Sequence, residues 1–258
     1  MQCSRIHTPD PKFHMVGSCL QSKGTIIGYG FQNDLQSCID YSVQRMGLAF
    51  NYRRLTNNKS KLLSDDNVNN NEVTCEVLDC PEYENFTSLE PSPNYNYYSF
   101  YANPLPILTY TCLPSIGLFN LHKEHVNYTQ AADICKEEGG DLAHILTDSR
   151  TIAISSFLRQ SFKGADISRK LAYVGLQDVN GNGKFQTPLE EPLTCFPYRA
   201  WAPSNPKPVN KHHYCVAIDT DKMWKTVKCG MKLPFICELY PNGPFDSTNI
   251  TLPESGCE

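Results

Sequence analysis

The stretch WAPSNPKPVNKHHYCVAIDTDKMWKTVKCGMKLPFICE, residues 201–238, decides the fold of the C-terminal half of this chain. It contains a Trp-Ala-Pro turn, two cysteines with thirteen residues between them, a second tryptophan and a closing FICE motif: Trp201, Cys215, Cys229, Trp224 and Cys237. The segments HYCVAI and PFICEL have the length and composition of buried strands. Few folds produce these features in this order.

The cysteine content indicates an oxidising compartment. The chain has 258 residues and 12 cysteines, and no two cysteines have the C-x-x-C spacing of a zinc site, so a disulfide framework is expected. Four N-x-S/T sequons support a secreted glycoprotein, with chance occurrence as the alternative: Asn58, Asn85, Asn127 and Asn249. The net charge of −4 gives no general reason to expect nucleic-acid binding.

The ends and apolar stretches of the chain predict no membrane span. The most apolar stretch, residues 105–119, is interrupted by Pro, Cys and Thr and is too short to cross a bilayer. The first residues do not have the pattern of a signal peptide, so we expect that a leader has been removed before Met1.

The N-terminal half predicts one helix and several strands. Apolar residues recur at three- and four-residue spacing over 33–46, Asn33 or Asp34 can cap the start, and Gly47 is expected to take the left-handed conformation that ends the helix. Alternating residues predict strands over 48–54, 73–77 and 95–102.

A helix that carries a cysteine, a strand, a polar loop and the strand TCEVLDC resemble the PAN/apple module over residues 1–111. The resemblance implies that the helix cysteine is tied to the central sheet, and the pairs Cys38–Cys75 and Cys19–Cys80 are expected. Two further cysteines common after the helix cysteine in that family are absent here, where Ser42 and Met46 or Gly47 stand. The alternative is an unrelated small disulfide-rich α+β domain.

The C-terminal half predicts two helices, a strand and a long loop. Thr129 can cap a helix that runs to Glu138, and Ser149 can open a second one. AYVGL, residues 172–176, has the pattern of a short buried strand. Residues 177–213 are rich in Gly, Pro and Asn, and long loops of this kind are usually functional or disordered.

These elements resemble the C-type lectin-like domain over residues 112–240. The motifs that carry the resemblance are AADICKEEGGDLAHI (131–145), YVGL (173–176), GNGKF (181–185), WAPSNP (201–206) and the closing cysteines with FICE. It implies an α+β fold with two helices, antiparallel sheets and a long loop, and the disulfides Cys135–Cys237 and Cys215–Cys229. The remaining cysteines are paired by guess as Cys3–Cys112 and Cys195–Cys257, the latter bridging to a C-terminal tail over residues 241–258.

Sugar-binding members of that family hold calcium with oxygens from three places, because this hard cation takes about 6–8 oxygen ligands. Here those places hold Asn205-Pro206-Lys207, His213 and Lys225-Thr226. Ammonium groups have no acceptor atom and repel a cation, so we predict no calcium at this place. The retained turn predicts a cis peptide bond before Pro206.

The candidate ligand-binding residues lie on this loop face: Asn205, Lys207, Lys211, His213, Lys225 and Thr226. From Asp178 to Lys232 the chain has eight Lys or Arg and five acidic residues, a net charge of +3. Such a face can attract an acidic glycan or protein, and a merely solvated charged loop is the alternative. Adjacent His212 and His213 point to opposite faces of a strand, which argues against a shared metal ion.

No P-loop, GxSxG or HExxH motif occurs, and the disulfides leave no thiol nucleophile, so no enzyme and no cofactor are expected. The sequence predicts a secreted recognition protein. Roles in matrix, adhesion or innate recognition are implied by the resemblance alone. The alternatives are a lectin that uses a non-standard site and a structural adaptor between extracellular proteins.

Overall fold

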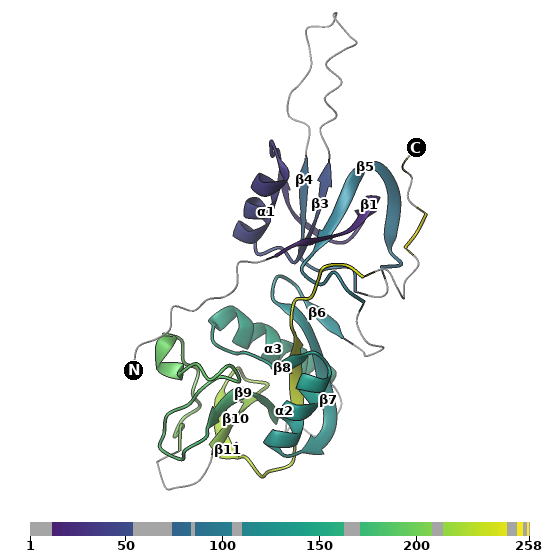
Figure 1. The fold of residues 1–258 in the computed structure, drawn as a ribbon. Coiled ribbons are helices and arrows are strands. Elements are labelled where there is room, and N and C mark those ends of the chain that lie inside the picture. Colours follow the sequence, from purple (N-terminus) through teal and green to yellow (C-terminus); the bar gives the residue numbers. More distant parts are fainter. Residues whose placement is uncertain are drawn as a thin grey trace, which may run out of the picture. The chain divides into compact units, whose positions relative to one another are not determined.

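The computed structural model describes residues 12–53, 74–83, 86–104, 110–162, 171–207, 214–246, 252–254 and 257 (Figure 1). These residues form two compact units, one drawn from 108–240 and the other from 8–107 together with 241–258. The segment expected to be a separate tail, 241–258, therefore belongs to the N-terminal unit. The sequons at Asn58, Asn85 and Asn249 lie outside the described residues.

The N-terminal unit is a five-stranded sheet with one helix. The strand order is β1-β5-β3-β4-β2, and every described pairing is antiparallel. The elements are β1 (His14–Ser22), β2 (Ile26–Gly30), α1 (Leu35–Gln44), β3 (Ala49–Arg53), β4 (Cys75–Leu78) and β5 (Leu89–Ser99).

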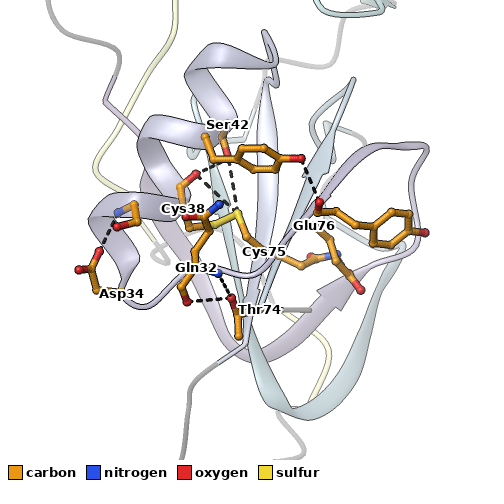
Figure 2. The surroundings of a disulfide bond; sticks show 11 residues. Gln32, Asp34, Cys38, Ser42, Thr74, Cys75 and Glu76 are labelled. Carbon is orange, nitrogen blue, oxygen red and sulfur yellow. Dashed lines mark hydrogen bonds between the residues drawn. A yellow bond between two sulfur atoms is a disulfide. The ribbon is translucent and has the colours of Figure 1, made fainter. Parts of the chain in front are cut away.

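The helix α1 is capped by Asp34 and is joined to the sheet by a disulfide. Asp34 caps it by accepting a hydrogen bond from the Ser37 amide at 2.7 Å, which lowers the pKa of the Asp34 carboxyl. Figure 2 shows the Cys38–Cys75 disulfide between α1 and β4, with Ser42 one helical turn further along. The Ser42 hydroxyl donates to the Cys38 carbonyl at 2.7 Å. The pairing predicted for Cys38 is the one in the structure.

The end of α1 differs from the prediction. Met46, not Gly47, has the left-handed backbone, with φ of 56°. Gly47 is needed for a different reason, because a Cβ there would lie 2.3 Å from Val77 Cγ1. The helix therefore ends against β4 at a position where only a glycine fits, while the exposed Met46 side chain points away from the core.

The C-terminal segment closes the N-terminal unit. Asn242 donates its amide to the Phe100 carbonyl at 2.9 Å, and its carbonyl accepts from the Ala102 amide at 3.0 Å. The rings of Phe86 and Phe245 meet edge to face at 5.7 Å, in the core formed with β1. We call residues 241–246, 252–254 and 257 the C-terminal strap.

The disulfide of the strap differs from two of the predicted pairings. Cys19 pairs with Cys257, so both Cys19–Cys80 and Cys195–Cys257 are wrong. Cys80 and Cys195 are disulfide-bonded as well. The physical reason is that the chain returns to β1 after the second unit, which places Cys257 beside Cys19 across 238 residues of sequence. No local pattern encodes such a return.

The C-terminal unit is built on a mixed sheet with the order β11-β10-β9-β12-β7-β6, with β8 paired to β12. The pairing of β12 with β9 is parallel and the others are antiparallel. The elements are β6 (Thr111–Leu113), β7 (Gly117–Val126), α2 (Tyr128–Glu137), β8 (Gly140–Leu142), α3 (Asp148–Ser161), β9 (Leu171–Asp178), η2 (Leu193–Cys195), β10 (Tyr214–Asp219), β11 (Trp224–Lys228) and β12 (Leu233–Leu239).

In both helices of this unit, the N-cap lies two residues before the residue predicted from the sequence. Asn127 caps α2 in place of Thr129, because its side chain accepts from the Gln130 amide at 3.0 Å and Gln130 bonds back to the Asn127 amide. Thr147 caps α3 in place of Ser149. The sequon residue Asn127 is therefore part of a helix cap.

Two disulfides join the elements of the C-terminal unit. Cys135 of α2 pairs with Cys237 of β12, and Cys215 of β10 pairs with Cys229. Both pairs are those that the resemblance implies. The first fixes α2 to the strand that contacts β7, β8 and β9, and the second closes the hairpin that carries Trp224.

We predict that the double variant Cys19→Ser/Cys257→Ser loosens the strap selectively. Loss of a native disulfide costs about 2–5 kcal/mol in a small domain. Hydrogen exchange at the amides of 241–246 should accelerate, while exchange in 110–162 serves as the internal control and should not change, because the two units have separate cores. Unchanged exchange in 241–246 would contradict the assigned role of the bridge.

Candidate ligand-binding site

The long loop begins at a turn built by a buried carboxylate. Asp178 at the end of β9 accepts hydrogen bonds from the Asn182 amide at 3.1 Å and from the Gly183 amide at 2.7 Å. The turn sends the chain back along β9, where the backbones of Gln177 and Gln186 exchange hydrogen bonds at 2.9 and 3.0 Å. The first part of the loop is therefore anchored to the sheet.

The two tryptophans fix the second part of the loop. The Trp224 amide donates to the Ala200 carbonyl at 2.8 Å, and the Ala202 amide donates to the Trp224 carbonyl at 2.9 Å. The rings of Trp201 and Trp224 meet at 5.4 Å and 85°. Trp224 is fully buried, and its indole nitrogen donates to the Thr151 hydroxyl at 3.3 Å. The loop is thereby held against β11.

The turn after Trp201 is closed by hydrogen bonds to Thr226. Asn205 Oδ1 accepts from the Thr226 hydroxyl at 2.8 Å and from the Thr226 amide at 2.9 Å. The Lys207 amide donates to the same hydroxyl at 3.0 Å. The Asn205–Pro206 peptide is cis, as the sequence predicts. Three predicted site residues, Asn205, Lys207 and Thr226, thus lie together.

Comparison with known families identifies this unit. Residues 124–239 match the family model of the lectin C-type domain. We call the unit that contains these residues the lectin domain, because this part of the chain is similar to that family. The match begins after the N-terminal unit, so the resemblance of that unit to the PAN/apple module stays a prediction.

Curated relatives match over about half of the chain. The hemolymph lipopolysaccharide-binding protein of Periplaneta americana is 24% identical over 126 residues, which are 48% of this chain and 49% of that protein. Collectin-43 of Bos taurus is 28% identical over 115 residues, 43% of this chain and 33% of that protein. The chain therefore spans less than half the length of these relatives.

Solved structures are similar over about half of the chain. Human lithostathine is 22% identical, with a TM-score of 0.41 and coverage of 48% of this chain and 91% of that chain. CEL-IV is 18% identical, with a TM-score of 0.45 and coverage of 55% and 97%.

Lys225 does not lie with the other predicted residues of the lectin domain. Its ammonium pairs with Asp219 at 2.8 Å, on the face of the β10–β11 hairpin opposite to Thr226. Successive side chains of a strand alternate, so the burial of Trp224 directs Thr226 toward the loop and Lys225 away from it. The prediction that Lys225 lies on the loop face with Asn205 and Thr226 is therefore wrong. Lys211 and His213 lie outside the described residues.

The sequence reasoning missed Asp219. Its Oδ1 accepts from the amides of Asp221 and Met223, both at 2.9 Å, and its Oδ2 pairs with Lys225. One carboxylate thus builds the hairpin turn and neutralises a neighbouring cation. Asp219 and Lys225 have opposite charges and pair across the β10–β11 hairpin. This cross-strand pattern is the sequence signal that could have indicated the role of Asp219.

One group within the described residues brings three metal-ligating side chains together, namely His122, Glu138 and Cys237. The Cys237 sulfur is bonded to Cys135 and cannot serve as a thiolate ligand. His122 Nε2 already pairs with Glu138 at 2.9 Å, and its ring stacks on Phe235 at 4.4 Å. The contact between His122 and Glu138 joins β7 to the residue that caps the end of α2.

We predict that Thr226→Val destabilises the loop turn without changing the shape of the side chain. The substitution leaves the Lys207 amide without its acceptor and removes one donor to Asn205, which should lower the free energy of unfolding by about 1–2 kcal/mol. Thr194→Val is the matched control, since Thr194 is exposed on the same loop, and should change it by less than about 0.5 kcal/mol. Equal effects of both variants in urea unfolding would show that the Thr226 hydroxyl does not hold the turn.

Proposed function

We propose that this protein is a secreted, non-enzymatic recognition protein whose lectin domain binds an acidic glycan or acidic protein surface without calcium. The observation that carries the proposal is the direct hydrogen bonding between Asn205 and Thr226 at the place where sugar-binding members hold the ion. The domain keeps the loop that forms a ligand site in that family and closes the position of the metal.

The oxygens at this position are already used within the protein. Asn205 Oδ1 accepts two hydrogen bonds, and the Thr226 hydroxyl donates one and accepts one from the Lys207 amide. A calcium ion would have to break these bonds and would find no carboxylate at Asn205, Lys207 or Thr226. Since calcium takes about 6–8 oxygen ligands, often from Asp and Glu, binding here is unfavourable.

The charge of the loop face supports an acidic ligand. Lys207 is exposed and forms no ion pair with any described residue, whereas Lys225 is partly neutralised by Asp219. An unpaired exposed cation beside a preformed turn can contact a sulfate, a phosphate or a carboxylate. Among the predicted cations, Lys207 is therefore the one that we assign to the ligand.

The cysteine content and the named relatives support an extracellular role in recognition. Twelve cysteines, of which no described one is free, fit an oxidising compartment. Among the described residues, no helix is both long and apolar enough to cross a membrane. One relative is named for binding lipopolysaccharide and another is a collectin, which supports a part in innate recognition.

The second candidate function is that of an adaptor between extracellular proteins, and the N-terminal unit favours it. Tyr29 of β2 is 60% exposed, and Met46 at the end of α1 is 65% exposed, with Phe31 also exposed. Exposed large apolar side chains of this kind are common in protein contacts. The PAN/apple resemblance, with a helix tied to the sheet by Cys38–Cys75, supports the same role.

Calcium should not stabilise the lectin domain. We predict the same thermal midpoint in millimolar calcium and in excess chelator, because a ligand that binds only the folded state would raise the midpoint. Isothermal titration calorimetry should show no heat at micromolar affinity. A calcium-dependent rise in the midpoint that Asn205→Ala removes would overturn the calcium-independent site.

Lys207→Gln should weaken binding to a sulfated glycan such as heparin, measured in chelator. Loss of one charge-assisted contact of about 1.4 kcal/mol corresponds to about a tenfold loss of affinity, and the dependence on salt should become shallower. Lys136→Gln, which removes an exposed charge on α2, is the control and should have little effect. Absence of glycan binding, together with a protein partner that needs Tyr29 and Met46, would favour the adaptor.

A further inference from the structure

A cleft in the long loop lies beside the turn that Asn205 and Thr226 close, and Pro206 of that turn is one of its lining residues. It has a volume of about 470 Å³, which falls within the range of about 300–1,000 Å³ that is usual for small-molecule sites. Its apolar wall comes from Phe185, Leu193 and Trp201, and its charged rim from Lys184 and Arg199. The lectin domain therefore holds a second concave site whose lining differs from that of a sugar site.

The apolar wall is held in place by the surrounding fold. The Phe185 and Trp201 rings lie 5.1 Å apart, and Trp201 in turn packs on the buried Trp224 at 5.4 Å. The Leu193 amide donates to the Phe185 carbonyl at 2.8 Å, which fixes the two sides of the wall to each other. Because these contacts lie within the protein itself, binding would require little ordering of side chains.

The rim carries two cations, and no acidic residue lines the cleft. Arg199 donates through Nη1 to the carbonyls of Phe196 and Tyr198, both at 2.6 Å, and through Nη2 to the Leu193 carbonyl at 2.8 Å. These bonds use three of the five guanidinium N–H groups. The other two N–H groups of Arg199 are available to a ligand, and the three bonds fix the position of the guanidinium. Lys184 is exposed and has no ion pair among the described residues.

We propose that this cleft binds a small amphipathic anion, with a flat apolar group against Phe185, Leu193 and Trp201 and an anionic group at Lys184 and Arg199. A neutral ligand would leave the two cations of the rim without a counter-charge, whereas an anionic group would pair with them. Burial of the apolar group supplies the affinity, and the two cations select the sign of the charge. The proposal does not depend on the calcium-independent site or on Lys207.

The test compares two fluorescent probes with the same aromatic skeleton. 8-Anilinonaphthalene-1-sulfonate carries a sulfonate, and N-phenyl-1-naphthylamine carries no charge. The native chain should bind the sulfonate with one-to-one stoichiometry and at least about tenfold more tightly than the neutral probe. Trp201 and Trp224 are the two tryptophans of the chain, so energy transfer from them to the probe is expected when the probe binds in this cleft.

Substitutions at the rim test whether the probe binds in the cleft. Thr194 is exposed at the rim, and Thr194→Trp should fill the cleft and abolish binding of both probes. Thr194→Glu should weaken binding of the sulfonate about tenfold and leave the neutral probe unchanged. Lys184→Gln should reduce the preference for the sulfonate about fivefold to tenfold, whereas Lys232→Gln, an exposed charge outside the cleft, should not.

The outcomes separate the proposal from its rivals. Equal affinity for the two probes, or full retention of sulfonate binding in both Thr194 variants, would overturn it. Loss of sulfated-glycan binding in Lys207→Gln with unchanged binding of the sulfonate probe would leave the cleft intact and show that the two sites are separate.

Discussion

The Cys135–Cys237 disulfide is the constraint on which the lectin domain depends, because it fixes α2 to β12. β12 is the strand that pairs with β7, β8 and β9, so it joins the two halves of the sheet. β9 pairs with β12, β10 pairs with β9, and β11 pairs with β10 as a hairpin. Trp224 on β11 then enters the core and gives the long loop a fixed wall to pack against.

The long loop is ordered by a chain of contacts that starts at this wall. The hydrogen bonds between the backbones of Trp224 and residues 200 and 202 align the loop with β11. Asn205 then closes the following turn on Thr226, two residues after Trp224. The same alternation that buries Trp224 brings Thr226 to the loop and sends Lys225 to Asp219. The closed turn at Asn205 and the separate placement of Lys225 thus have one structural origin.

Much of the lectin domain could be predicted from the sequence, since its cysteines, tryptophans and Trp-Ala-Pro turn are local patterns at fixed spacing. Three findings could not be predicted so easily. The pairing of Cys19 with Cys257 depends on the chain returning to the first unit. Gly47 is required by the approach of Val77, which no local rule describes. The cleft beside Trp201 depends on the hydrogen bond from the Leu193 amide of η2 to the Phe185 carbonyl. A bond between backbone groups does not require particular side chains, so the sequence does not predict it.

A crystal structure of the lectin domain grown in calcium tests the central claim most directly. We expect that Asn205 Oδ1 remains within hydrogen-bond distance of the Thr226 amide and hydroxyl, with no ion beside it. An ion about 2.3–2.6 Å from Asn205 Oδ1, with further oxygen ligands around it, would contradict the account.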